Sequence, residues 1–303
     1  MKTSMKKWLR CTLPVILALL SVFALLPLQR GKINRSDWMA QLDDSAALHE
    51  LTIPGTHDSG ALYSLADVVG KCQTLPIREQ LKIGVRFFDI RLQLVDNSLK
   101  LVHSIVDQMT DLEAVLEDMI LFLRENPSEF LLVSFKEDAD PRRSDADFAE
   151  SLEQALLSYP EISHSTTLPA SVGDARGKLH IIARYKNASV GIPCYDGWQD
   201  DTSFVLNGLY VQDNYQVKSS GEKLFDIAET FTIADELRYA LVLNFTSCYV
   251  SPSFPPIYAG VPAHDINRWL SEGIAQSTNT VGVIVCDFIT SELADIIIER
   301  NFQ

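Results

Sequence analysis

The sequence predicts an α/β fold, a single irregular (β/α)8 TIM-type barrel that follows an N-terminal apolar export or anchor helix. Three observations support it. The chain has 303 residues, 47% of them hydrophobic, which is enough for one large core. Short apolar runs recur along it, and amphipathic stretches separate several of them. A doubly wound open sheet is the competing architecture, and it is less favoured because no glycine-rich phosphate loop follows the first strand.

The apolar runs are of strand length, and most are continuous rather than alternating. This pattern is typical of parallel strands that are buried on both faces of a sheet. The expected strands are residues 48–53, 84–90, 99–102, 130–135, 178–183, 208–212, 239–245 and 281–286.

The expected helices lie between and after these strands. Residues 111–126 place five apolar side chains on one stripe and end before Pro127. Residues 144–159 begin with a serine or aspartate cap and have the same period. Residues 273–276 and 291–302 supply later helical segments, the last of which closes the chain. The apolar stripe of the first helix comprises Leu112, Val115, Leu116, Met119 and Leu123.

The beginning of the chain has the composition of a leader. Residues 1–35 hold seven Lys or Arg and no acid, and residues 11–28 are 18 uncharged, mostly apolar residues. A basic region before an apolar region is an export signal, and 18 residues also suffice to span a bilayer. We therefore expect residues 1–30 to be a signal peptide or a membrane anchor. Residues 36–303 would form the catalytic barrel outside the cytoplasm, either secreted or anchored.

The remainder of the chain is acidic, with 19 basic against 40 acidic residues. This balance argues against nucleic acid as a partner, which requires a basic face. It also argues against adhesion to anionic membranes by charge alone, so any lipid contact would be specific or apolar.

Four cysteines lie in this acidic part, and their spacing is neither that of a disulfide framework nor that of a zinc site. We expect buried free thiols at Cys72, Cys194, Cys248 and Cys286, and the alternative is that two of them form one disulfide.

Polar side chains gather at the carboxyl ends of the expected strands. Each alone has a structural explanation, such as a helix cap. The carboxyl ends of barrel strands meet at one mouth, however, so together these residues predict a single pocket. The candidates are His57, Asp58, Asp89, Arg91, His103, Lys136, Arg184, Asp213, Tyr215 and Asp287.

The residue types suit phosphoryl transfer without a metal. Arg91, Arg184 and Lys136 can neutralise a phosphate and hold vicinal hydroxyls. Two histidines offer a base and an acid near neutral pH. A metal-assisted enzyme would need a cluster of carboxylates and histidines, and Arg91 stands where such an enzyme could place another acid.

Six segments in the right order resemble the bacterial phosphatidylinositol-specific phospholipases C, from about residue 45 to the end of the chain. They are "IPGTHDSG", "GVRFFDIR", "NPSEFLLVSFKE", "GKLHIIARY", "GLYVQDNY" and "VGVIVCDFI". The resemblance implies a distorted (β/α) barrel that cleaves phosphatidylinositol to diacylglycerol and inositol 1,2-cyclic phosphate without a cofactor. Glycosyl-phosphatidylinositol anchors remain open as a second substrate.

The resemblance also implies roles for five residues in the reaction. His57 matches the general base that takes the proton of the inositol 2-hydroxyl, and Asp287 matches the carboxylate that orients this base. Arg91 matches the arginine that holds the phosphate. His103 matches the general acid that protonates the departing diacylglycerol oxygen, and Asp58 matches the partner of that acid and of Arg91.

Lys136, Arg184, Asp213 and Tyr215 match the headgroup pocket, with the tyrosine ring stacked on the inositol. We assign Asp89 to the same substrate-binding set. The implied partners are the phosphatidylinositol headgroup and a membrane surface, with the protein acting as a monomer.

The chain departs from this pattern at two places. Ser104 follows His103 where relatives commonly have glycine. The loop at 251–260 offers Phe254, Ile257 and Tyr258 for bilayer contact in place of tryptophans, and packing on the protein's own body is the alternative.

Two other functions compete. A metal-dependent barrel phosphodiesterase would need carboxylate ligands whose spacing is missing. A catalytically silent lipid- or glycan-binding barrel would lack one of His57, Arg91, His103 or Asp287, and all four are present.

Overall fold

Among the described residues, eight parallel strands form the continuous path of a curved sheet, and a ninth pairs beside one of them. The order along the path follows the chain except at the first strand of the path. The computed structural model describes residues 33–64, 70–104, 106–138, 145–250, 260–276 and 281–303. The sheet lies within the unit Asn34–Gln303, and the barrel-type α/β fold predicted from the sequence is confirmed. In sheet order the parallel strands are β6 (Ile162–Ser163), β7 (Leu179–Arg184), β5 (Leu131–Glu137), β2 (Phe87–Val95), β1 (Ile53–Thr56), β14 (Val283–Cys286), β12 (Leu241–Phe245) and β10 (Leu209–Gln212).

The barrel is irregular because it is open along one side. β9 (Ser203–Leu206) runs antiparallel to β10 at one edge, and β8 (Ile192–Pro193) is a ninth parallel strand, which pairs with β7 at the other edge. Among the described residues, no strand pairing joins these two edges. A further pair of short strands, β11 (Gln216–Val217) and β13 (Tyr249–Val250), forms a separate two-stranded sheet.

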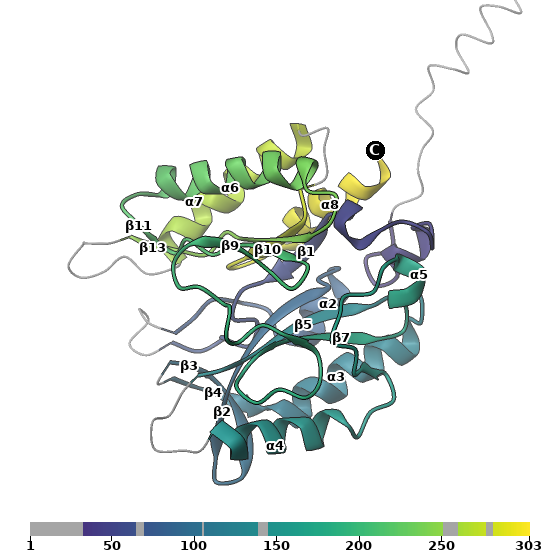
Figure 1. The fold of residues 1–303 in the computed structure, drawn as a ribbon. Coiled ribbons are helices and arrows are strands. Elements are labelled where there is room, and N and C mark those ends of the chain that lie inside the picture. Colours follow the sequence, from purple (N-terminus) through teal and green to yellow (C-terminus); the bar gives the residue numbers. More distant parts are fainter. Residues whose placement is uncertain (1–32, 65–69, 105, 139–144, 251–259, 277–280) are drawn as a thin grey trace, which may run out of the picture. The chain divides into compact units, whose positions relative to one another are not determined.

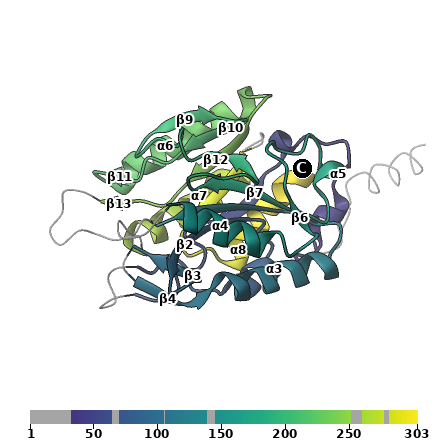
Figure 2. The same ribbon diagram turned by 60° about the horizontal axis from the view of Figure 1, so that its bottom comes forward.

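Helices cover the outside of the sheet, with α3 and α4 on one flank and α6 and α7 on the other (Figures 1 and 2). The predicted stripe of α3 is buried at all five positions, and the Asp111 side chain caps this helix by accepting from the Ala114 N–H. The α-helices are α2 (Ile77–Lys82), α3 (Leu112–Glu125), α4 (Asp145–Leu156), α5 (Val172–Ala175), α6 (Ser220–Glu236), α7 (Gly260–Gln276) and α8 (Ser291–Glu299); the 3-10 turns are η1 (Trp38–Gln41), η2 (Leu48–Glu50) and η3 (Arg300–Phe302).

Two strand predictions were wrong in detail. Residues 48–50 form η2, and the first strand begins only at Ile53. Residues 99–102 lie in β3 (Ser98–His103), which is antiparallel to β2 and pairs with β4 (Val106–Asp111). The cause is the two-residue turn Asp96–Asn97, whose φ values of 49° and 63° are those of a tight type I′ hairpin. The parallel strands β6 and β8 were not predicted, because each has only two residues and is too short to be recognised as an apolar run.

A buried ion pair closes the amino-terminal end of the barrel. Arg86 Nε lies 2.8 Å from Glu129 Oε2, and neither side chain is exposed to solvent. Arg86 also donates to the carbonyls of Arg35 and Ser36, and Glu129 Oε1 accepts from the Met39 N–H. Residues 35–39, which precede the first strand, are therefore tied to the amino-terminal end of the barrel, called its closed end below.

The end of the chain lies at the same closed end. Asn301 exchanges hydrogen bonds with the backbone of Thr52, directly before β1. Asp295 of α8 forms a two-point ion pair with Arg35, with both N–O distances at 2.5 Å.

The four cysteines of the body are free and buried, as predicted. The predicted leader, residues 1–30, and the loop 251–259 lie outside the described residues. Within the described part of the chain, no helix has both the length and the apolar character needed to cross a membrane.

Removing the carboxylate of Glu129 should strongly destabilise the fold. Glu129→Ala leaves the Arg86 guanidinium buried without a counter-charge, which costs on the order of 3–5 kcal/mol. The free energy of unfolding in urea measures this loss. Glu161→Ala is the matched control, because it breaks the exposed Arg124–Glu161 pair and should cost at most about 1 kcal/mol. Equal losses in the two variants would contradict the central role of the buried pair.

Candidate active site

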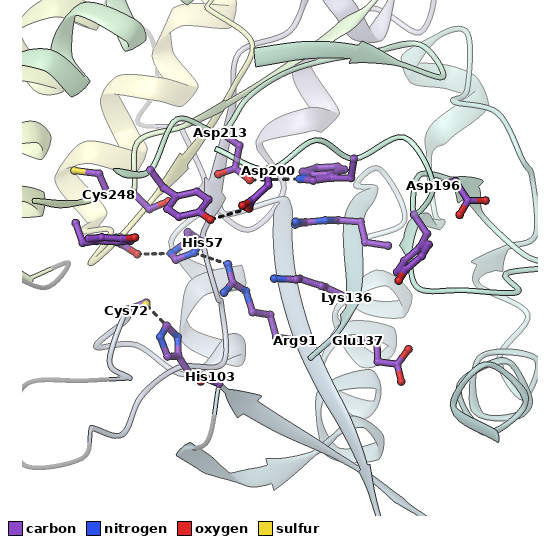
Figure 3. A pocket seen from close by; sticks show the side chains of 18 residues that line it. His57, Cys72, Arg91, His103, Lys136, Glu137, Asp196, Asp200, Asp213 and Cys248 are labelled. Atoms are coloured by element: carbon purple, nitrogen blue, oxygen red, sulfur yellow. Dashed lines mark hydrogen bonds and ion pairs between the residues drawn. The ribbon is translucent and has the colours of Figure 1, made fainter. Parts of the chain in front are cut away.

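A pocket of about 910 Å³ lies at the carboxyl end of the parallel strands. Eighteen side chains line it (Figure 3). Eight of the ten residues predicted from the sequence are among them: His57, Arg91, His103, Lys136, Arg184, Asp213, Tyr215 and Asp287. The other two, Asp58 and Asp89, are buried beside the lining residues, with exposed fractions of 2% and 0%.

The turn after β1 aims His57 and Asp58 at different partners. The His57 N–H donates to the Cys286 carbonyl of β14, and the Ser59 N–H donates to the Asp89 carbonyl of β2. Asp58 between them has a φ of 38°, in the left-handed region that short polar residues tolerate better than most. The turn is therefore fixed to both neighbouring strands, which explains its dense sequence of proline, glycine and capping residues.

His57 is held in the tautomer of a general base. Its Nδ1 lies 2.8 Å from Asp287 Oδ1, so the ring donates this proton to a carboxylate that is only 1% exposed. Nε2 is then left as an acceptor, and Arg91 Nη2 donates to it at 2.6 Å. Asn267 supports the pair from α7, since its side-chain amide donates to the Asp287 carbonyl at 2.9 Å.

His103 forms a second histidine–aspartate pair. Its Nδ1 lies 2.5 Å from Asp58 Oδ2, and Arg91 Nε lies 3.6 Å from the same oxygen. We expected His103 to end a parallel barrel strand, but it ends the antiparallel β3. The hairpin brings β3 back along β2, with Leu101 opposite Leu92, so that its carboxyl end returns to the pocket.

Three basic residues form a row across adjacent strands. Arg91 of β2 is in register with Lys136 of β5, and Lys136 is in register with Arg184 of β7. Figure 3 shows Arg91 and Lys136 pointing into the same space. The positive charge of Arg91, and after it burial, lowers the pKa of the Lys136 ammonium.

Asp89 lies beneath this row. Its Oδ2 is 3.2 Å from Arg91 Nε, and its Oδ1 is 3.3 Å from Arg184 Nη1. Ser134 Oγ and the Asp58 N–H also donate to this carboxylate. Burial by itself would raise the pKa of Asp89, but Arg91 and Arg184 outweigh it and hold this pKa well below its usual range.

Trp198 and Asp200, which the sequence analysis missed, line the pocket beside the predicted Arg184, Asp213 and Tyr215. The Arg184 guanidinium stacks 3.6 Å from the ring centroid of Trp198, and Trp198 Nε1 donates to Asp213 Oδ2 at 3.4 Å. The Tyr215 hydroxyl donates to Asp200 Oδ1 at 2.7 Å. Burial, and then this hydrogen bond, raises the pKa of Tyr215 to about 12. Trp198 and Asp200 lie on the irregular connection between β7 and β9, where hydrophobic periodicity carries no information.

The departure at Ser104 has a conformational explanation. Ser104 has a φ of 54°, in the region that glycine adopts without strain, and its N–H donates to Asp138 Oδ2 at 3.0 Å. This hydrogen bond fixes the residue directly after His103.

Two clusters among the described residues have the donor types of a metal site. One comprises His57, Cys72 and Asp287, and the other comprises Asp58, Cys72 and His103. Both contain Cys72, which the sequence analysis treated only as a buried thiol.

Comparison with known proteins supports one family. Residues 51–185 match the family model described as phosphatidylinositol-specific phospholipase C, X domain. A 1-phosphatidylinositol phosphodiesterase of Listeria monocytogenes is 24% identical over 321 residues, covering 98% of each chain. A protein of the same name from Staphylococcus aureus is 31% identical over 204 residues, covering 59% of this chain and 64% of the relative.

Solved structures are similar over most of the chain. The phosphatidylinositol-specific phospholipase C of Listeria monocytogenes superposes with a TM-score of 0.74 at 22% identity, covering 88% of this chain and 99% of that one. A point mutant of the corresponding Staphylococcus aureus enzyme superposes with a TM-score of 0.75 at 25% identity, covering 87% and 96%. Residues 51–185 are therefore similar to the X domain of phosphatidylinositol-specific phospholipase C, and the chain has the fold of the bacterial phosphatidylinositol-specific phospholipases C.

Proposed function

We propose that this protein is a phosphatidylinositol diacylglycerol-lyase, which cleaves phosphatidylinositol to diacylglycerol and inositol 1,2-cyclic phosphate. The observation that carries the proposal is the arrangement of two histidine–aspartate pairs around one arginine. Arg91 lies 2.6 Å from His57 Nε2 on one side and 3.6 Å from Asp58 Oδ2 on the other. A phosphate bound to Arg91 would have a base and an acid within reach.

In the first half of the reaction, His57 Nε2 removes the proton of the inositol 2-hydroxyl. The oxygen attacks the phosphorus atom, which is tethered to the neighbouring carbon. Tethering makes the attack intramolecular and so avoids much of the entropic cost of bringing the reactants together. Asp287, buried against Nδ1, stabilises the imidazolium that forms.

In the second half, the bond from phosphorus to the diacylglycerol oxygen breaks. His103 donates a proton to this oxygen, and Asp58 holds the imidazolium form of His103 ready by accepting from Nδ1. Arg91 offsets the negative charge that develops on the phosphate oxygens. One proton is taken and one is given, so the cyclisation is balanced without a metal-bound water.

The inositol ring would be bound by side chains that line the pocket beyond Arg91, namely Lys136, Arg184, Asp213 and Tyr215. Asp89 has a different role in this proposal from the one expected from the sequence. Its side chain is fully buried, so it positions Arg91 and Arg184 from below and does not contact the headgroup.

We further infer that residues 36–303 act outside the cytoplasm as a monomer at a membrane surface. The support is the basic and apolar composition of residues 1–30 and the acidic composition of the remainder, which disfavours nucleic acid. Glycosyl-phosphatidylinositol is the alternative substrate.

Replacing the proposed general base, His57, should strongly lower the rate at which the metal-free protein cleaves phosphatidylinositol. We expect the wild-type protein, incubated with phosphatidylinositol micelles and excess EDTA, to produce inositol 1,2-cyclic phosphate in phosphorus NMR. His57→Ala should lower the rate by at least about 10²–10⁴-fold, the usual contribution of general base catalysis. His164→Ala is the control, because His164 is exposed on a loop away from the pocket lining. Turnover that appears only after calcium or magnesium is added would contradict the proposal.

Asp89→Asn should change how stability depends on pH. The folded-state pKa of Asp89 lies below its ordinary value, so the ionised carboxylate stabilises the fold above about pH 4. This contribution is lost as the pH falls below that value. The difference in unfolding free energy between wild type and Asp89→Asn should therefore be largest near about pH 6 and shrink toward about pH 3. Urea unfolding measures it, and the exposed Asp147→Asn is the control. A difference that is constant with pH would argue against the ionic role of Asp89.

A further inference from the structure

Cys72 lies between the two histidine–aspartate pairs of the pocket. Its Sγ is 3.7 Å from His103 Nδ1, and Figure 3 shows the thiol directed at this ring. Donor atoms of Asp58, Cys72 and His103 all lie within 4.8 Å of one another, and the same holds for His57, Cys72 and Asp287. The proposed reaction makes no use of this sulfur.

The backbone holds Cys72 in this position. Its N–H donates to the Ala61 carbonyl at 2.9 Å, and its carbonyl accepts from the Phe288 N–H at 2.8 Å. The next residue, Gln73, donates from its side chain to the carbonyls of His57 and Cys286. The backbone of Cys72 is therefore tied to the segments that carry His57 and Asp287.

We propose that Cys72, His103 and Asp58 form an inhibitory binding site for a thiophilic divalent cation of the Zn²⁺ class. Sulfur, imidazole nitrogen and carboxylate oxygen are ligands that Zn²⁺ accepts together. Tetrahedral Zn²⁺, with bonds of about 2.3 Å to sulfur and 2.0 Å to nitrogen, places these two atoms about 3.5 Å apart. The observed distance of 3.7 Å between Sγ and Nδ1 is close to this value. Asp58 Oδ2 is hydrogen-bonded to Nδ1 at 2.5 Å, and the two atoms must move apart when the metal enters.

A second observation is the state of the neighbouring Asp287. Its Oδ1 accepts from His57, but its Oδ2 is buried and has no hydrogen-bond partner among the described residues, so one oxygen of a carboxylate close to the sulfur has no donor. Burial raises the pKa of the Cys72 thiol, and the charges of Asp287 and Asp58 raise it further. A bound cation would offset both carboxylates and so favour the thiolate.

Arg91 limits which cations bind. Its Nε lies 3.6 Å from Asp58 Oδ2 and repels a cation there. Ions that depend on carboxylates alone, such as Ca²⁺ and Mg²⁺, have no compensation for this repulsion. Ions that gain a strong bond to sulfur do, so the site should select Zn²⁺, Cd²⁺ and Co²⁺ over Ca²⁺.

Occupancy would stop the reaction, an inference that rests on the proposed function. The metal forms bonds to Sγ and to Nδ1, and the thiol proton is released. A neutral imidazole keeps its proton on Nε2, whereas an imidazolium releases the Nδ1 proton to solvent. In either case His103 becomes a weaker acid, since donating the remaining proton would leave an imidazolate. Asp58 is also withdrawn from His103 and Arg91.

Direct binding tests the site independently of activity. The metal-free full-length chain is titrated with Co²⁺, and a sulfur-to-cobalt charge-transfer band is recorded. We expect the band in wild type and in Cys248→Ser, which removes a second thiol that lines the same pocket, and its loss in Cys72→Ser. His103→Ala should weaken Zn²⁺ binding, measured by calorimetry, by more than about tenfold, because even changes outside the ligand set cost roughly 10–100-fold. His57→Ala should retain the band.

Inhibition is measured with Zn²⁺ on phosphatidylinositol micelles, comparing each variant with its own metal-free rate. The half-inhibitory Zn²⁺ concentration should rise more than about tenfold in Cys72→Ser and stay near the wild-type value in Cys248→Ser. Adding EDTA should restore activity. Equal inhibition of Cys72→Ser and wild type, or a cobalt band that Cys72→Ser retains, would overturn the site. A band that survives His103→Ala but not His57→Ala would overturn the ligand assignment. If the wild type turns over no phosphatidylinositol, the proposed function fails while the cobalt titration still decides the site.

Discussion

The buried carboxylate of Asp89 is the interaction on which the rest of the pocket depends. Three cationic side chains in one register row repel one another, and the charge of Arg91, followed by burial and the charge of Arg184, lowers the pKa of Lys136. Asp89 contacts two of the three, Arg91 and Arg184, and accepts from the Asp58 N–H as well. One anion thus joins Arg91, Arg184 and the turn that carries His57. Catalytic geometry and folding stability are coupled at this point.

Much of this site could be predicted because a parallel barrel converts order in the sequence into proximity in space. Residues at the carboxyl ends of strands meet, whatever their separation along the chain. His57 and Asp287 are 230 residues apart and form a hydrogen bond because β1 and β14 are neighbours. The same rule placed His103 correctly for an incorrect reason, since the tight Asp96–Asn97 turn returns an antiparallel strand to the same end.

The features that could not be predicted lie in the irregular segments between strands, or depend on how deeply a side chain is buried. The connection from β7 to β9 contains no helix, so nothing in its periodicity indicates that Trp198 stacks on Arg184. Asp89 and Arg91 are two residues apart on one strand and share a face, which the sequence shows. That one is fully buried and the other reaches the pocket follows only from how the neighbouring strands pack. The sequence around Cys72 indicates only a core thiol, and its closeness to Asp58 and Asp287 follows from the folded turns around it.

The closed end of the barrel has a practical consequence for handling the protein. The body of the protein runs from Asn34 to Gln303. Its first and last segments are joined by the Arg35–Asp295 ion pair and the Thr52–Asn301 hydrogen bonds, at the amino-terminal end of the strands. The pocket opens at the carboxyl end of the same strands. A bead, a fusion partner or a lipid tether joined to the body at Asn34 or at Gln303 is thus attached on the face away from the pocket. Such an immobilised protein would direct its pocket toward a second surface brought up to it.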